Sequence, residues 1–292
     1  FRHHYALPIE RDHDDTMAAQ LRSLTSPFLL RRLKSDPAVI SDLPEKTEIV
    51  MRATLTAEQA GLYQAVVDDM MEKIQQAKGL QRKGAVLAAL TKLKQVCNHP
   101  AHYFCDGSAV LRHGQHRSGK LALLEELLST ILAEGEKALI FTQYKEFGEY
   151  LSDYVRKRFG VPAPFLHGSL RREERDAMVD SFQSPDGPPI MVLSLKAGGT
   201  GLTLTAANHV IHYDRWWNPA VENQATDRAY RIGQTKDVQV RKLVCDGTIE
   251  ERIDDIISHK STMSDLVVST GETWLTELDD EQLQELFRLE VT

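Results

Sequence analysis

From residue 118 onwards the chain alternates short apolar segments with helical ones, and this alternation constrains the fold more than any other feature. The apolar segments are the runs ALIFT, PFLH, IMVLSL, HVIHYD and VQVRKLV, separated by helical patterns or, after IMVLSL, by a glycine-rich loop. Strands that alternate with helices form a parallel sheet covered on both faces. We therefore predict an α/β fold in which ligands bind beyond the carboxyl ends of the strands.

The residues before this pattern have a different character. Residues 56–96 predict helices, because Leu62, Val66, Met70 and Ile74 recur at four-residue spacing. An earlier polar stretch has strand-like alternation around Ile49 and Met51. We divide the chain into a linker at 1–54, a helical insertion at 55–117, the α/β lobe at 118–260 and an acidic tail that packs as a helix at 261–292.

Composition excludes several classes of protein. The 292 residues are 42% hydrophobic and 26% charged, which excludes a disordered tail, a collagen and a coiled-coil rod. Three cysteines cannot form a disulfide framework and indicate a reducing compartment. The sequence lacks a signal peptide and a long apolar run, so we predict a soluble protein without a membrane partner. Because it begins at Phe1, we expect it to be a piece of a longer chain.

The net charge of −7 is unevenly distributed. Residues 272–290 carry a net charge of −6, which leaves −1 for the rest of the chain. A nearly neutral body with local basic clusters can still bind a phosphate backbone. The total charge therefore does not exclude a nucleic-acid partner.

Two motifs upstream have a simpler structural interpretation. The run from Gly114 to Lys120 has P-loop spacing, but Leu121 stands where a P-loop needs a hydroxyl for Mg²⁺, so we favour a helix start. Cys97, His99, His102 and Cys105 could in principle bind zinc, but they are crowded into nine residues. We favour the interpretation that Cys97 is a buried structural cysteine and that a helix ends just after it, and we predict no metal site.

Three motifs follow predicted strands. The glycines of Ala197–Gly201, next to Lys196, permit close approach of a ligand or form a plain turn. On a helix predicted over 219–230, Gln224, Arg228 and Arg231 lie on one face, which is either a solvated face or a phosphate site. The pair Trp216–Trp217 could stack on bases, but we favour its anchoring a loop into the core.

In order and spacing, the motifs ALIFTQY, LHGSL, LSLKAGGTGLTLTAANHVIHYDRWWNP and QATDRAYRIGQ strongly resemble the second lobe of the SWI/SNF-type helicase-like ATPases of helicase superfamily 2. Upstream, SPFLLRRLKSD, DLPEKTE, LTAEQAGLY and LKQVCNHP match the connecting and insertion segments of that family, and the tail WLTELDDEQLQELFRL resembles bacterial members. The family often has Pro where Arg215 stands, Asn where Thr203 stands and His where Tyr230 stands.

The resemblance implies a RecA-like lobe of a two-lobe motor, whose first lobe belongs to the same parent chain. ATP would bind between the lobes, with Mg²⁺ held mainly by the first lobe, which has the P-loop and the acidic box. Catalytic roles would fall to Arg228, Arg231 and Gln224, and cofactor contacts to Gly199, Gly201 and Asp227. This segment alone is therefore expected to be inactive.

The resemblance also implies a double-stranded DNA partner, contacted through its backbone. The positions that match family DNA contacts are Thr142, Gln143, His167, Gly168, Lys196 and Thr203. Such binding is sequence-tolerant and salt-sensitive. Closure and opening of the lobes would move the motor along the duplex and remodel a DNA-bound protein. In a bacterium, we expect the protein in the cytoplasm, associated with the nucleoid. In a eukaryote, we expect it in the nucleus.

Two alternatives remain open at this point. One is a non-enzymatic DNA-binding or regulatory module with a decayed motor, which an intact P-loop upstream would exclude. The other is a strand-separating or RNA helicase, against which the Trp-Trp-Asn-Pro segment and the helical insertion argue.

Overall fold

The computed structural model describes residues 15–25, 43–195, 201–216, 218–258 and 271–290. The chain divides into two compact units, Phe1–Leu43 and Pro44–Thr292. Helix α2 (Asp15–Thr25) is the element described in the first unit. The sheet and the candidate site belong to the second unit.

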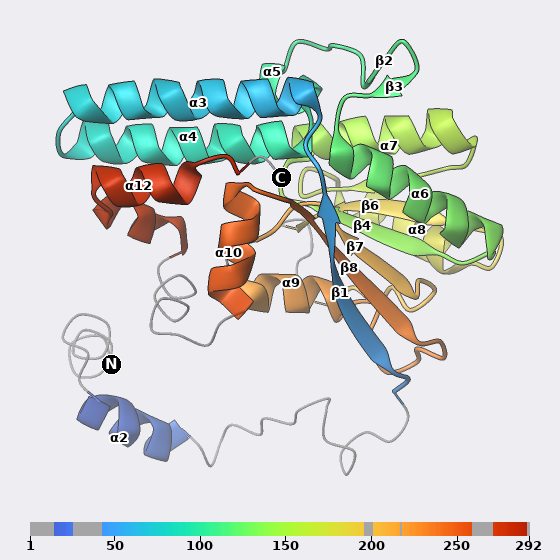
Figure 1. Ribbon diagram of the computed structural model, residues 1–292. Coiled ribbons are helices and arrows are strands. Elements are labelled where there is room, and N and C mark those ends of the chain that lie inside the picture. The colour runs from blue at the N-terminus through green and yellow to red at the C-terminus, as the bar shows by residue number, and fades with distance from the viewer. Residues whose placement is uncertain (1–14, 26–42, 196–200, 217, 259–270, 291–292) are drawn as a thin grey trace. The chain divides into compact units, whose positions relative to one another are not determined.

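Six strands form one sheet in which every pair of neighbours is parallel, in the order β1-β8-β7-β4-β6-β5 (Figure 1). Their bounds are β1 (Lys46–Ala53), β4 (Ala138–Thr142), β5 (Phe165–Leu166), β6 (Ile190–Ser194), β7 (His209–His212) and β8 (Val238–Cys245). All five strands predicted after residue 118 are present. The predicted α/β fold is confirmed.

The sixth strand, β1, comes from the segment that we assigned to the linker. It pairs with β8 along its whole length, from Lys46 opposite Val238 to Ala53 opposite Cys245. Most of its side chains are exposed, including Ile49 at 52%. A strand at the edge of a sheet needs less apolar sequence than a central one, which is why the pattern indicated a strand without placing it in the sheet.

Helices cover both faces of the sheet. On one face lie α6 (Gly119–Ala133) and α7 (Lys145–Phe159), packed on Ile140 and its neighbours. On the other lie α8 (Arg172–Gln183) and α9 (Pro219–Thr226), packed on Phe141. Successive side chains of a strand point to opposite faces of the sheet. Because helices cover both faces at β4, all five of its residues are buried.

A second layer of helices lies beside the sheet (Figure 1). It consists of α3 (Ala57–Gln76), α4 (Leu80–Asn98), α5 (Pro100–Phe104), α10 (Ile249–Ser258), the 3₁₀ helix η4 (Gly271–Glu277) and α12 (Asp280–Phe287). The long helices α3 and α4 pack against each other, and Val66, Met70 and Leu90 lie in their shared apolar cluster. A short hairpin, β2 (Leu111–Arg112) and β3 (Gln115–His116), joins α5 to α6.

The described part of the acidic tail packs on this helical layer. Trp274, Leu275, Leu283 and Phe287 are buried in the same apolar cluster as α3 and α4. Its acidic side chains pair with basic ones of α4 and α10, in the pairs Glu272–Lys94, Glu277–Lys83, Asp280–Arg82 and Glu290–Arg252. The negative charge of the tail is thus partly neutralised within the fold.

Among the described residues, none of the helices combines the length and the apolarity that crossing a bilayer requires.

Candidate functional site

The predicted site residues gather where the direction of the chain across the sheet reverses. From β4 the chain continues to β5 and β6 on one side, and it then returns to the other side of β4 to form β7. The loops that follow β4, β6 and β7 leave the same edge of the sheet, because the strands are parallel. Such a reversal point is where open α/β sheets bind ligands.

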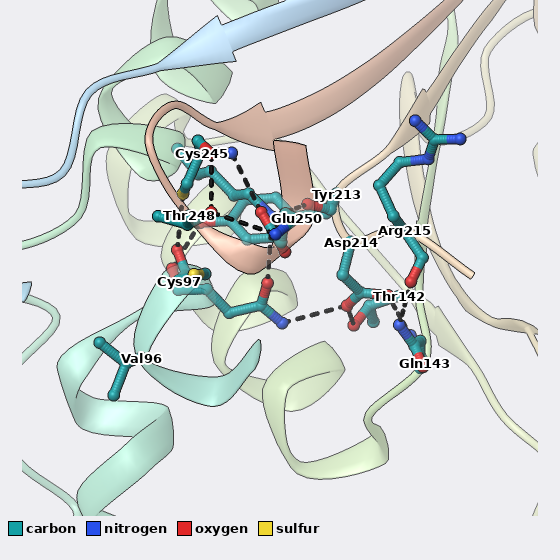
Figure 2. A network of polar contacts seen from close by, with 12 residues as sticks. Val96, Cys97, Thr142, Gln143, Tyr213, Asp214, Arg215, Cys245, Thr248 and Glu250 are labelled. Carbon is teal, nitrogen blue, oxygen red and sulfur yellow. Dashed lines mark hydrogen bonds and ion pairs between the residues drawn. The ribbon is translucent and has the colours of Figure 1, made fainter. Parts of the chain in front are cut away.

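Asp214, the second residue after the end of β7, organises this edge (Figure 2). Its Oδ2 accepts hydrogen bonds from Thr142 Oγ1 at 2.6 Å and Asn98 Nδ2 at 3.1 Å, and its Oδ1 accepts from Gln143 N at 2.9 Å. The side chain is completely buried. Burial raises the pKa of Asp214, while the hydrogen bond from Thr142 and the charge of Lys120 oppose that rise.

The predicted DNA contacts differ in exposure. Thr142 is fully buried, so a phosphate contact from its hydroxyl would require the bond to Asp214 to break. Gln143 is half-buried, and its Nε2 donates to Arg215 O at 2.6 Å. His167 is half-buried and Gly168 is exposed. Burial, followed by the nearby charge of Lys145, lowers the pKa of His167.

The remaining predicted contacts follow β6. Thr203 is half-buried, whereas Lys196 and Gly199 lie outside the described residues. Gly201 is exposed, and its φ of 110° is a conformation that favours glycine. The backbone conformation at this position therefore requires a glycine.

The helix that carries Gln224 is shorter than we predicted. Asn218 caps α9 by accepting from Ala220 N at 2.9 Å, and the helix ends at Thr226 instead of residue 230. Beyond it, Arg228 N bonds to Ala225 O and Ala229 N to Thr226 O, which are the three-residue bonds of tight turns. Gln224 is therefore on the helix, and the two arginines are on the turns after it.

The two arginines lie in different environments. Arg228 is 6% exposed, and its Cζ lies 5.8 Å from the centre of the Phe141 ring. Burial lowers the pKa of Arg228 from its usual high value. Arg231 is exposed, with Nη1 3.4 Å from Leu202 O, and Gln224 is exposed as well. Asp227, predicted as a cofactor contact, is half-buried.

Gln234 holds the turns in place. Its Nε2 lies within hydrogen-bond distance of three carbonyl oxygens, those of Thr205, Ala207 and Ala229. Its Oε1 accepts from two backbone N–H groups, and the side chain is 4% exposed. A second link is the bond from Leu204 N to Arg228 O at 2.9 Å. The arginine turns and the segment after the glycine loop are thus fastened to each other.

The P-loop-like run is a helix start, as predicted. Ser118 caps α6, and a Cβ on Gly119 would collide with Thr54 O, so this glycine permits close packing. Lys120 points into the core, with Nζ 2.7 Å from Glu250 Oε1 and 3.0 Å from Tyr213 O. Burial alone would lower the pKa of Lys120, but the Glu250 carboxylate raises it above its ordinary value.

The four candidate zinc ligands have other partners. His99 accepts from Ala101 N at 2.9 Å and lies 3.0 Å from Val110 O through its other nitrogen. His102 stacks on Phe147, and burial lowers its pKa to about 3. Cys105 is exposed, whereas Cys97 is buried at the end of α4.

Cys97 lies instead beside Cys245 and Glu250, with ligand atoms within 4.8 Å of one another. The Glu250 carboxylate is already engaged by Lys120 Nζ and by Cys245 N at 3.0 Å. A metal at this position would have to displace both partners.

The segment around Trp216 is anchored, as we favoured. Trp216 packs against the apolar cluster on the α8 and α9 face, and its backbone N donates to Glu222 Oε1. Trp217 lies outside the described residues. Arg215, where the resembling family often has Pro, forms buried ion pairs with Glu222 and Asp254.

Sequence reasoning missed Asp214, Glu222 and Gln234 as organising residues. Asp214 carried a signal, since a carboxylate directly after an apolar strand lies at the ligand-binding edge. Its partners could not be identified, because Asn98 is 116 positions away and Thr142 is 72 positions away.

Two family models match the chain. The helicase conserved C-terminal domain matches residues 119–233, and the SNF2-related domain matches residues 1–102. The boundary between the two matches falls between the helical layer and α6. The first match covers everything from α6 to the arginine turns.

Curated relatives extend the likeness over the whole chain. Over 292 residues, the chain is 51% identical to YwqA of Bacillus subtilis (strain 168), whose name describes a candidate ATP-dependent helicase/translocase. It is 36% identical over 265 residues to a mouse SWI/SNF-related regulator of chromatin, subfamily A member 1. The alignments cover 100% and 88% of this chain, but only 31% and 25% of the two relatives.

Solved structures agree. The SWI2/SNF2 ATPase core of Sulfolobus solfataricus in complex with dsDNA has a TM-score of 0.75 at 41% identity, covering 100% of this chain and 60% of that one. The C-terminal domain of the ATPase from the same organism has a TM-score of 0.72 at 39% identity, covering 85% of this chain and 100% of that one. The predicted RecA-like lobe with its helical region is confirmed. On fold, motifs and relatives together, this chain belongs to the SWI2/SNF2 family and contains its helicase C-terminal region.

Proposed function

We propose that this chain is the C-terminal motor lobe of a DNA-dependent ATPase that translocates on double-stranded DNA and remodels protein–DNA complexes. The observation that carries the proposal is the exposed Arg231 on a turn that Gln234 and the bond from Leu204 N to Arg228 O fasten to the segment after the glycine loop. An exposed guanidinium on a fixed backbone is preorganised for an anionic ligand. The likeness to a SWI2/SNF2 core bound to dsDNA supports the DNA partner.

The guanidinium groups of Arg228 and Arg231 suit the oxygens of a polyphosphate. ATP with Mg²⁺ would supply the phosphoryl group that is transferred to water. Arg231 would neutralise charge that develops on that group, and Arg228 would contribute once a closing movement exposes it. Gln224 would help to order the site, while Asp227, Gly199 and Gly201 would line it.

The first lobe would come from the remainder of the full-length protein. It would supply the P-loop and most contacts to Mg²⁺, because Lys120 is committed to Glu250 in the core of this lobe. This segment alone would then be inactive, as its sequence implies. We expect the full-length protein to act in the cytoplasm on nucleoid DNA in a bacterium.

DNA would be held through its phosphates at the loops after β4, β5 and β6. Gln143, His167, Gly168, Lys196 and Thr203 are the proposed contacts, and the buried Thr142 would join them only if its bond to Asp214 breaks. Backbone contacts make binding sequence-tolerant and weaker at high salt. Movement of the lobes during hydrolysis would displace a DNA-bound protein.

The proposal is tested by steady-state ATP hydrolysis of the full-length protein with and without duplex DNA, for the wild type and Arg231→Ala. We expect DNA-stimulated turnover that the substitution abolishes, with ATP binding largely retained. Arg288→Ala, another exposed arginine, is the matched control and should keep wild-type turnover. Normal turnover in Arg231→Ala would refute the assignment of this arginine.

The same assay addresses the alternatives. Absence of turnover in the wild type would indicate a DNA-binding module with a decayed motor. Efficient unwinding of a forked duplex, or stimulation by RNA alone, would indicate a strand-separating or RNA helicase. Neither result is expected.

A further inference from the structure

We propose that Asp214 is a positioning residue that couples the helical layer to the proposed DNA-contacting loop after β4. The inference rests on the proposed function, because that function gives the loop its DNA ligand. Asp214 itself need not contact DNA. It is completely buried, and it acts through the residues that it holds (Figure 2).

The first argument is that Asp214 receives donors from separate segments. Thr142 Oγ1 and Gln143 N come from the end of β4, whereas Asn98 Nδ2 comes from the end of α4. One carboxylate therefore binds the strand end and the helix end at the same time. Hydrogen bonds to a charged acceptor are stronger than those between neutral groups, so this junction favours one geometry.

The second argument is that the amide of Asn98 has a fixed orientation. Lys120 Nζ lies 3.4 Å from Asn98 Oδ1 and 3.0 Å from Tyr213 O, and it pairs with Glu250 at 2.7 Å. Because an ammonium only donates, Asn98 must present its oxygen to Lys120 and its NH₂ group to Asp214. The buried lysine thus aligns both the amide and the peptide that precedes Asp214.

The third argument concerns the loop that would meet DNA. Asp214 Oδ1 accepts from the backbone of Gln143, and the carbonyl of the next residue, Arg215, accepts from the Gln143 side chain. Main chain and side chain of Gln143 are therefore both set by the Asp214–Arg215 segment. Arg215 is in turn held by Glu222 and Asp254, the latter on α10 of the helical layer. A displacement of the helical layer would consequently move Gln143.

The experiment measures ATP hydrolysis by the full-length protein against the concentration of duplex DNA. For Asp214→Asn, whose NH₂ group would face other donors, we expect the half-saturating DNA concentration to rise about tenfold, with the rate at saturating DNA within about twofold of wild type. Asn98→Ala removes the link from Asp214 to α4, together with the Asn98 Oδ1 acceptor of Lys120, and it leaves the bonds of Asp214 to Thr142 and Gln143; it should give about a threefold rise. Asp153→Asn, the same change at an exposed site on α7, should change neither quantity.

A second readout reports positioning without DNA. Amide hydrogen exchange of the segment 138–147 in the full-length protein should become about tenfold faster in Asp214→Asn and remain unchanged in Asp153→Asn. If the wild type shows no DNA-stimulated turnover, the proposed function fails, and hydrogen exchange still decides whether Asp214 positions the loop.

The proposal is overturned if Asp214→Asn loses thermal stability but keeps the wild-type half-saturating DNA concentration, since its role would then be structural only. If Asp214→Asn does not fold, Asn98→Ala decides. Unchanged exchange and unchanged half-saturation in that variant would show that the helical layer is not coupled to the loop.

Discussion

Two polar regions of the lobe differ in what surrounds them. On α9 and the turns after it, Gln224 and Arg231 are exposed. At the junction of β4, β7 and α4, the polar side chains of Lys120, Asp214 and Glu250 are buried and bonded to one another or to neighbouring segments. Exposed charges are available to a ligand, whereas buried, paired ones fix the geometry of the fold.

The comparison predicts that substitutions in the first region lower turnover, whereas those in the second lower stability and, at Asp214, raise the DNA concentration needed for half-maximal turnover. Arg228 is close in sequence to the first region but is buried like the second. A substitution of Arg228 should therefore lower both turnover and stability.

The largest expected effect is on turnover. Arg231→Ala should lower DNA-stimulated ATP hydrolysis by about 10³–10⁵-fold while changing the free energy of unfolding by no more than about 0.5 kcal/mol. Arg228→Ala should lower turnover and also cost about 2 kcal/mol of stability, because it leaves a gap over Phe141. Turnover and denaturant unfolding of the full-length protein measure the two effects. Equal stability of the two variants would contradict the comparison.

The next largest effect is at the buried ion pair. Lys120→Met should lower the free energy of unfolding by about 3–5 kcal/mol, because it leaves the Glu250 carboxylate buried without its cation. Lys157→Met removes an exposed lysine that pairs with Asp153 and should cost less than about 1 kcal/mol. Urea unfolding monitored by circular dichroism compares them. A loss below about 1 kcal/mol in Lys120→Met would show that the pair contributes little.

A smaller loss is expected at the residue that fastens the arginine turns. Gln234→Ala leaves three carbonyl oxygens without their side-chain donor and should cost about 1–3 kcal/mol. Because the turns carry Arg231, turnover should fall as well, which distinguishes this variant from Lys157→Met. Retention of full turnover together with lost stability would show that the turns keep their shape without Gln234.

The smallest effect concerns pH. Burial lowers the pKa of His102 to about 3, below its ordinary value of 6.5, so the folded state holds the ring neutral. This residue's contribution to stability is therefore present above about pH 6.5 and is lost as the pH falls toward the folded-state value, by about 1 kcal/mol between pH 7 and about pH 5.5. His102→Phe keeps the stacking on Phe147 and should reduce the acid sensitivity by that amount, measured by unfolding at both pH values. An unchanged pH dependence would argue against burial of a neutral ring.

The sequence predicted the sheet well because its central strands are continuous apolar runs. Fully buried strands such as β4 and β6 are apolar up to their last residue, so ALIFT and IMVLS stand out from their surroundings. The edge strand β1 was recognised as a strand and left outside the sheet, because its exposed residues carry no sign of a partner. The helix after Pro219 was predicted too long, because the turns that end it depend on Gln234 and Leu204.

The candidate site was predicted in part. Motif order and spacing located Gln224, Arg228 and Arg231 near one strand end, and their roles stay predictions. The burial of Arg228 and Thr142 was not foreseeable, since exposure depends on packing against Phe141 and on a carboxylate 72 positions away.

By itself, the sequence determined the fold class and the family, because these depend on local apolar patterns and short motifs. Tertiary structure alone decided which charges are exposed and which are paired. Lys120 follows a phosphate-binding spacing yet lies in the core with Glu250, and Arg231 is exposed yet lies beside Leu202 in the segment after the glycine loop. The physical reason is that burial and pairing are set by residues distant in the chain, such as the 130 positions that separate Lys120 from Glu250.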